Sequence, residues 1–182
     1  MSPSDTPQLR FLVDTNVWLD AFIDRSRNHD AALAFLKDAR LSNTPLFTAI
    51  EATKDVYYLV TLELKRMQRR EVGEVTESFA NAVREAAWSC ITAMRRNSTI
   101  VAADASDMVE AIALRADHDD YENNLIIAAA IRANATHIIS SDKQLQACSP
   151  IACIGLDEAL ELMGTPQSPS GTGSANISLA FR

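Results

Sequence analysis

Five short segments rich in apolar and β-branched residues alternate along this chain with longer segments of helical periodicity. The expected strands span residues 11–13, 45–49, 99–101, 137–140 and 151–154. Strands that alternate with helices form parallel sheets, because each crossover lays a helix on one face of the sheet. The sequence therefore predicts an α/β fold, a three-layer sandwich with a central, mainly parallel sheet flanked by helices.

The helical segments carry apolar residues three or four positions apart. In the first of them, Ala31, Phe35 and Ala39 define one apolar face. The expected helices span residues 17–40, about 52–70, 74–94, 105–115, 125–135 and 156–163. The segment 125–135 is rich in Ala and Ile almost all round, so we expect it to be buried on most of its faces.

The chain has 182 residues, a length that suits one domain, which we expect over residues 1–164. After Gly164 the composition changes to Pro, Ser, Gly and Thr. Such a composition buries little surface, so residues 165–182 are expected to form a flexible tail. The closing stretch Ile177–Phe181 is apolar and either docks as an extended segment or stays loose.

The sequence argues against a membrane protein and against a zinc-binding protein. No segment approaches the roughly 20 apolar residues of a membrane span, and the first ten residues do not resemble a signal peptide. We therefore expect a cytoplasmic protein. The three cysteines form no CxxC pair and the three histidines are isolated, which argues against structural zinc. We expect the cysteines to be small buried hydrophobic residues.

The net charge of −7, considered alone, argues against a nucleic-acid binder, because affinity for a polyanion usually requires an excess of Lys and Arg. That argument weakens where several carboxylates gather around a cation, since the ion reverses the local field. A basic cluster does occur near the end of the second helix, at Lys65, Arg66, Arg69 and Arg70. It either forms a solvated helix C-terminus or guides a phosphate backbone.

Carboxylates follow the expected strands. Asp14 and Asp142 come after two of them, and Asp55 is expected in the first turn of the helix after the second strand. Further acids, Asp119, Asp120 and Glu122, stand at the start of the buried helix. Each alone is explained by the preference of acids for helix N-termini. Gathered at the carboxyl edge of a parallel sheet they would repel one another unless a cation such as Mg²⁺ or Mn²⁺ bound them. Such an ion can activate water and stabilise the oxygens of phosphodiester cleavage.

Four segments, in order, resemble the blocks of the PIN domain family, which includes the ribonuclease toxins of VapC-type toxin–antitoxin pairs. They read FLVDTNVWLD at 11–20, TKDVYYLV at 53–60, DYENNLIIAAA at 120–130 and HIISSDK at 137–143. Each block is a weak signal, whereas four in order at suitable separations are a strong one. The resemblance covers about residues 9–163 and implies a metal-dependent endoribonuclease.

The resemblance also implies roles for individual residues. The catalytic carboxylates would be Asp14, Asp55 and Asp142, and the metal set would add Glu122 and Asn123. The site would be supported by Asn16 and by Ser140 or Ser141. Glu51 rivals Asp55 as the second acid, but the Tyr57-Tyr58 pair favours Asp55 in the family pattern.

One position departs from the pattern. The family usually has an Asp where this chain has Asn123, whose amide offers an oxygen but no charge. Either Glu122, Asp120 or Asp119 compensates, or the metal site is impaired. The alternative function is therefore a catalytically impaired PIN domain that binds RNA or a protein.

The resemblance further implies RNA as substrate, a small antitoxin as a possible partner, and a homodimer. Two other classes rank lower. A HAD-like phosphatase also begins with an Asp after its first strand, but it needs a second Asp where this chain has Asn16. A nucleotide-binding Rossmann domain would need a GxGxxG or Walker motif, and neither occurs.

Overall fold

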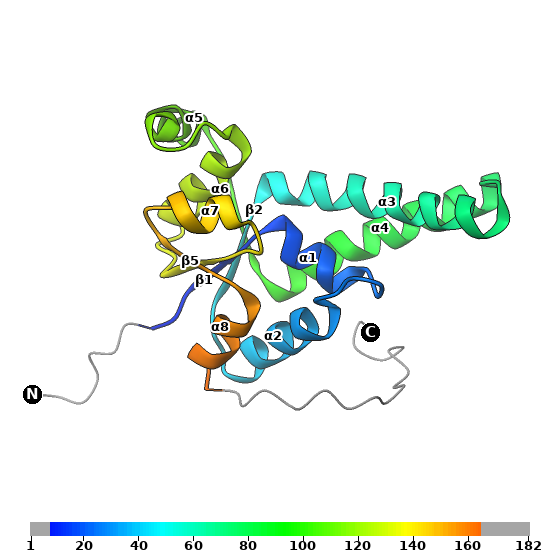
Figure 1. Cartoon of the computed structure of the whole chain (residues 1–182), viewed down its shortest axis with the longest axis horizontal. Coiled ribbons are helices and arrows are strands. Elements are labelled where there is room, and N and C mark those ends of the chain that lie inside the picture. Colours follow the sequence, from blue (N-terminus) through cyan, green and yellow to red (C-terminus); the bar gives the residue numbers. More distant parts are fainter. Residues whose placement is uncertain (1–7, 165–182) are drawn as a thin grey trace, which may run out of the picture.

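Five parallel strands form one sheet at the centre of the fold (Figure 1). The structure, a computed structural model, describes residues 8–164. The strand order is β3-β2-β1-β4-β5, so the first strand is central. The strands are β1 Phe11–Val13, β2 Leu46–Ala49, β3 Thr99–Val101, β4 His137–Ile139 and β5 Ala152–Ile154. The expected α/β fold with a parallel sheet is confirmed.

Helices cover both faces of the sheet. They are α1 Thr15–Phe22, α2 His29–Leu41, α3 Ile50–Val72, α4 Glu77–Asn97, α5 Ala105–Ala113, α6 Tyr121–Arg132, α7 Lys143–Cys148 and α8 Leu156–Leu162. Because side chains alternate along a strand, Phe11 and Val13 pack into one core with α1, α2, α3, α4 and α8. Leu12 packs into a second core with α6 and α7. The sheet therefore lies between two helical layers.

Helices α3 and α4 pack along each other and extend beyond the sheet as a helical hairpin (Figure 1), called here the arm. Gly73 ends α3 in the left-handed conformation, with φ of 89°. Thr76 begins α4 by accepting the backbone N–H of Phe79 on its side chain. A glycine after one helix and a threonine cap before the next suit a tight connection, because both satisfy backbone groups that helix ends leave open.

The prediction of one helix over residues 17–40 is wrong, because α1 and α2 are separated by residues 23–28. The carboxylate of Asp20 holds this turn by accepting hydrogen bonds from the side chains of Ser26 and Asn28. Short polar side chains that bond locally compete with the helical backbone pattern. The chain therefore turns although its apolar residues keep a helical spacing.

Several smaller expectations change as well. Because α3 already begins at Ile50, Asp55 lies in its second turn and not in its first. The sequence did not predict α7, a short helix that Asp142 caps. Cys148, at the end of α7, is exposed and not a buried hydrophobic residue.

The expected tail, residues 165–182, lies outside the described residues, and so does its apolar stretch Ile177–Phe181. Among the helices of residues 8–164, none combines the length and the apolar character needed to cross a membrane.

Candidate metal site

Asp14 directly follows β1 and caps the N-terminus of α1. Its Oδ1 accepts a hydrogen bond of 2.6 Å from the backbone N–H of Thr15. Its own backbone N–H donates to the carbonyl of Ile139 at 3.1 Å. Because β1 and β4 are parallel neighbours, the loops that leave them meet at the same edge of the sheet. The Asp14 side chain is thereby held at this edge with only 7% of the residue exposed.

Ser140 joins the two loops. Its Oγ donates to Oδ2 of Asp14 at 2.7 Å and accepts the backbone N–H of Asp142 at 3.0 Å. Asn16 braces the same point, because its amide nitrogen donates both to Asp14 and to Ser140 Oγ. The amide oxygen of Asn16 accepts the backbone N–H of Ser141 at 3.1 Å. Ser140 therefore acts through its side chain, whereas Ser141 acts through its backbone.

Asp142 begins α7 and faces the first turn of α6. Its Oδ1 accepts the backbone N–H of Gln144 at 2.8 Å, and its Oδ2 accepts the amide nitrogen of Asn123 at 3.1 Å. Asn123 is fixed in turn, because its own backbone N–H is capped by the side chain of Asp120 at 3.1 Å. The residue that departs from the family pattern is thus a hydrogen-bond donor to Asp142, a role that a carboxylate does not fill.

The two carboxylates influence each other's charge. Burial raises the pKa of Asp14, and the nearby charge of Asp142 raises it further, while hydrogen bonds from Ser140, Thr15 and Asn16 oppose the rise. Burial also acts to raise the pKa of Asp142, but the hydrogen bond from Asn123 and those from the α7 backbone outweigh it. The pKa of Asp142 is therefore below its ordinary value. The charged form of Asp14 is thus destabilised, whereas the charged form of Asp142 is stabilised.

The other predicted acids lie apart from this pair. Within residues 8–164, no hydrogen bond or ion pair joins Asp55 or Glu122 to Asp14 or Asp142, and no three His, Cys, Asp or Glu side chains are arranged to hold a metal ion. Asp55 is half-buried and pairs with Lys54 at 3.2 Å. Glu122 is exposed. The structure thus brings together two of the three expected carboxylates.

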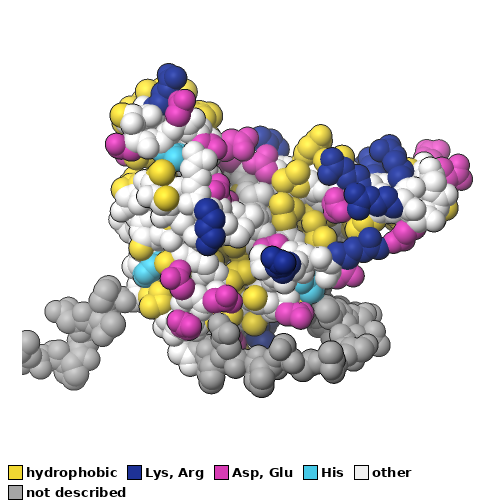
Figure 2. Space-filling view, viewed as in Figure 1, with side chains coloured by type: hydrophobic (Ala, Val, Ile, Leu, Met, Phe, Trp, Pro, Cys, Tyr) yellow, Lys and Arg dark blue, Asp and Glu magenta, His cyan; other side chains and the backbone are white. Residues whose placement is uncertain are grey.

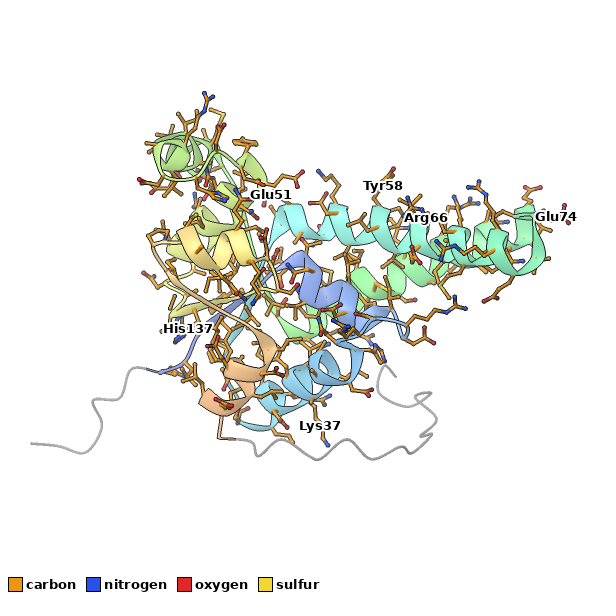
Figure 3. The ribbon with its side chains drawn as sticks, in the orientation of Figure 1. Lys37, Glu51, Tyr58, Arg66, Glu74 and His137 are labelled. Carbon is orange, nitrogen blue, oxygen red and sulfur yellow. The ribbon has the colours of Figure 1, made fainter. Side chains whose placement is uncertain are left out.

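Glu51, the rival of Asp55, lies in the first turn of α3, at the end of the arm nearest the sheet (Figure 3). It is half-buried, and Asp55 follows one helical turn later. Both acids therefore stand on the part of α3 that leaves the carboxyl end of β2, and no contact decides between them.

Two residues near the pair were not singled out from the sequence. Burial and the charges of Asp14 and Asp142 raise the pKa of the Cys153 thiol to about 12, so this β5 residue lies within electrostatic range of both carboxylates. An electrostatic contribution from His118, buried just before α6, helps to lower the pKa of Asp142. The order of strands would have indicated Cys153, because β5 lies next to β4.

The basic cluster Lys65, Arg66, Arg69 and Arg70 lies in the outer half of α3. From Asp55 to Arg66 the helix rises about 16 Å. The labels Glu51, Tyr58, Arg66 and Glu74 in Figure 3 follow the arm outward from the sheet. Figure 2 shows Lys and Arg side chains gathered on the arm, where acidic side chains also lie at the outer end. The cluster is thus several turns from Asp55 along α3, and acids lie among its cations, since Glu63 pairs with Arg66.

The oxygen atoms at the carboxylate pair are of the type that binds a divalent cation. A carboxylate has about four lone-pair positions, and three hydrogen bonds reach each of Asp14 and Asp142. Asn123 uses its amide nitrogen for the hydrogen bond to Asp142, which leaves its amide oxygen as a further metal ligand. Oxygen donors of this type suit Mg²⁺ or Mn²⁺, and a cation would offset the burial of the Asp14 anion.

Solved structures share the fold. The crystal structure of Mycobacterium tuberculosis VapC20, a sarcin–ricin loop cleaving toxin, is 16% identical over 75% of this chain and 93% of that chain, with a TM-score of 0.52. The crystal structure of FitAcB from Neisseria gonorrhoeae is 13% identical over 80% of this chain and 97% of that chain, with a TM-score of 0.53. At these identities the likeness concerns the fold alone.

A comparison with curated proteins finds no match to this chain. The family model described as PIN domain matches residues 10–144, well over half of the sequence. This span runs from the start of β1 to the start of α7, so it contains the whole candidate metal site. With its parallel sheet and its aligned blocks, the chain belongs to the PIN domain family.

Proposed function

We propose that this protein is a divalent-metal-dependent endoribonuclease that hydrolyses phosphodiester bonds in RNA. One observation carries the proposal: the carboxylate of the buried Asp14 and the backbone N–H of Asp142 share the hydroxyl of Ser140 where β1 and β4 end. Two carboxylates are held close together by fixed hydrogen bonds, a costly arrangement that a cation would relieve. Membership of the PIN domain family, a family of nucleases, supports the same reading.

In this proposal Asp14 and Asp142 hold the ion, which would be Mg²⁺ or Mn²⁺. Such an ion lowers the pKa of a bound water and stabilises the charge that develops on phosphate oxygens. Asn123 would contribute its amide oxygen, and Asp55 on α3 and Glu122 on α6 would complete the metal set that the family resemblance implies. Ser140 and Asn16 keep the Asp14 carboxylate in place.

RNA is the proposed substrate, with its backbone guided by the arm. The basic side chains of Lys65, Arg66, Arg69 and Arg70 offer a local cluster of positive charge in a chain whose net charge is −7. The fold shared with VapC20, a toxin that cleaves the sarcin–ricin loop, supports a toxin of this kind, and a cytoplasmic location is part of the proposal. A small antitoxin as partner and a homodimer belong to the same proposal.

The test is cleavage of a panel of structured and single-stranded RNAs with Mn²⁺, Mg²⁺ or EDTA. Asp14→Asn keeps the shape of the side chain and removes its charge, so cleavage should fall by at least about 100-fold. Asp38→Asn, on α2, is the matched control and should cut as the unmodified protein does. Cleavage that persists in EDTA, or in Asp14→Asn, would contradict a metal-dependent role for the pair.

A second function has its own observation. Asn123 already donates an N–H to Oδ2 of Asp142, and this hydrogen bond occupies a lone pair of the carboxylate that a metal ion would otherwise bind. The domain would then be an impaired nuclease that binds RNA or a protein. If the unmodified protein is inactive on the same RNA panel and Asn123→Asp cuts, this second function replaces the first.

A further inference from the structure

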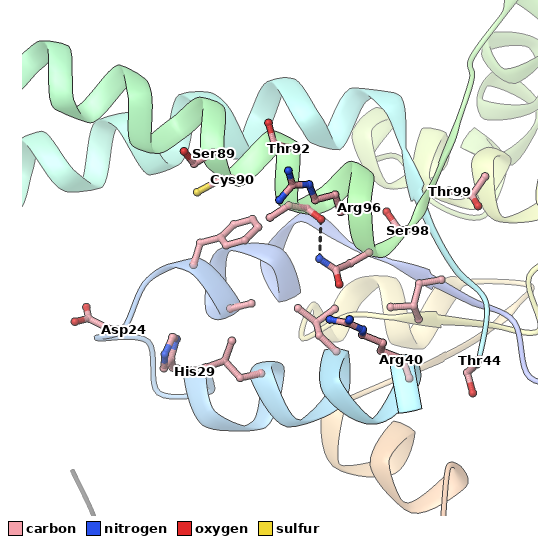
Figure 4. A pocket seen from close by; sticks show the side chains of 18 of the residues that line it. Asp24, His29, Arg40, Thr44, Ser89, Cys90, Thr92, Arg96, Ser98 and Thr99 are labelled. Carbon is pink, nitrogen blue, oxygen red and sulfur yellow. Dashed lines mark hydrogen bonds between the residues drawn. The ribbon is translucent and has the colours of Figure 1, made fainter. Parts of the chain in front are cut away.

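A groove separate from the metal site runs between α2 and α4 (Figure 4). Its volume is about 1490 Å³, and the end of α1 and part of α3 complete its walls. None of Asp14, Asp55, Asn123 or Asp142 lines it. The metal site and this groove are therefore independent features of the fold.

Apolar side chains cover much of the groove. Leu33 and Leu36 come from α2, Leu64 comes from α3, and Cys90 and Ala93 come from α4. Leu33, Leu64 and Cys90 pack against the main core and still keep part of their surface open. Apolar surface of this kind is stabilised when another segment covers it.

One wall carries a buried polar atom without a partner. His29 lines the groove and is only 9% exposed. Its Nδ1 lies 2.9 Å from the carbonyl oxygen of Asp20, which can only accept, so Nδ1 is the donor. Among the described residues Nε2 has no hydrogen-bond partner. In the neutral ring this atom accepts, and because it is buried from solvent it stays unsatisfied beside the groove.

We propose that the occupant is the segment Ile177–Phe181 of this same chain. Residues 177, 179 and 181 are Ile, Leu and Phe, with Ser178 and Ala180 between them. In an extended segment alternate side chains lie on one side, so the three large apolar residues would face the groove together. The segment from 165 to 176 contains no comparable apolar stretch.

The length of chain permits this docking. The described fold ends at Gly164, just after α8, and α8 packs against α2, one wall of the groove. Twelve residues, 165–176, span at most about 40 Å when extended. The thirteen residues of α2 are about 20 Å long. The apolar stretch can therefore reach any point along α2.

The charges along the groove are mixed, because Arg40 and Arg96 line it together with Asp24. Asp24 is exposed at the α1–α2 turn and lines the groove beside His29 (Figure 4). Arg182 directly follows the apolar stretch, so a segment that runs along α2 toward the α1–α2 turn would bring a positive charge to Asp24. Docked in this way, the tail is a tethered competitor for any peptide that binds the groove.

The test measures how fast the Cys90 thiol is alkylated in the full chain, relative to the exposed Cys148, by N-ethylmaleimide and peptide mass mapping. Cys90 lines the groove and Cys148 does not. A tethered segment at an effective concentration of about 1 mM and a Kd of about 0.1 mM leaves the groove open about a tenth of the time. The double variant Leu179→Asp/Phe181→Asp should therefore raise the rate at Cys90 about tenfold and leave Cys148 unchanged.

The matched control places two acids in the polar part of the tail, Thr172→Asp/Ser174→Asp, and should alkylate as the unmodified protein does. An equal Cys90 rate in all three proteins would overturn the proposal. Sedimentation velocity of each variant gives the second readout. If the loss of Cys90 protection coincides with dissociation of a dimer, the segment docks in a second copy, and docking within one chain is wrong.

Discussion

Asn123 stands where the family pattern has an acid, and it donates its amide N–H to Asp142 at 3.1 Å. In Asn123→Asp that bond is lost, a carboxylate faces Asp142, and the pKa of Asp142 should rise. At an effective dielectric constant of about 20, one added charge 4 Å from a divalent cation contributes about 8 kcal/mol. Repulsion and desolvation offset part of this gain, so we expect Mn²⁺ affinity to rise on the order of tenfold.

Isothermal titration with Mn²⁺ measures this change. Asn81→Asp adds the same charge at an exposed position of α4 and serves as control, with an affinity close to that of the unmodified protein. Equal affinities in Asn123→Asp and Asn81→Asp would show that position 123 is no metal ligand.

Ser140 is 1% exposed and holds both carboxylate loops through one hydroxyl. Ser140→Ala leaves the buried Asp14 without one donor and the Asp142 backbone N–H without its acceptor. The free energy of unfolding should fall by about 1–3 kcal/mol, because each lost partner leaves a polar group unsatisfied. Ser141→Ala removes an exposed hydroxyl and should change it by less than about 0.5 kcal/mol. Urea denaturation of the two variants measures these free energies of unfolding. Similar decreases in both variants would contradict the role given to the Ser140 hydroxyl.

At the scale of elements, α5 and α6 are joined by a two-point ion pair. Arg132 donates to Oδ1 of Asp107 at 2.9 Å and to Oδ2 at 2.8 Å, and Asp107 is buried. The hydrogen bond from Arg132 lowers the pKa of Asp107 below its ordinary value of 3.8. The folded state therefore gains stability from this ion pair above pH 3.8 and loses it as the pH falls below that value.

Asp107→Asn tests this dependence. Its Tm should lie below that of the unmodified protein near neutral pH, and the difference should shrink as the pH falls below about 3.8. Asp117→Asn, at an exposed position after α5, should show no such pattern. A Tm difference that stays constant across this range would mean that the charge of Asp107 does not stabilise the α5–α6 contact.

The elements also show what the sequence could and could not predict. The strands and the parallel sheet followed from short apolar runs that alternate with helices. Asp14 and Asp142 were found because acids at strand ends share one edge of a parallel sheet. The break between α1 and α2 depends on side chains folding back onto Asp20, a contact that periodicity does not contain. Likewise the Asn123 amide could be identified as a departure, but not as a donor to Asp142.

At the scale of the whole molecule, the carboxylate pair and the basic cluster of the arm lie in two separate regions, although α3 also carries Glu63 and Glu71. Acids gather where the strands end, and the cations Lys65, Arg66, Arg69 and Arg70 lie on the outer half of α3 (Figure 3). With a net charge of −7, the molecule repels a polyanion except where such a cluster faces it. If the arm guides RNA, the affinity for RNA must depend more on the cations of the arm than on cations elsewhere in the protein.

Arg66→Glu tests this role of the arm, measured in an Asp14→Asn background so that RNA is not cut. Each cation that neutralises a phosphate of single-stranded RNA contributes about 0.7 to the slope of log affinity against log salt concentration. Arg66→Glu should therefore weaken binding and reduce this slope by about 0.7 or more. Lys37→Glu makes the same charge change on α2, away from the arm (Figure 3), and should affect binding far less. If both variants weaken binding equally, the effect comes from net charge, and the arm is not the RNA-binding surface.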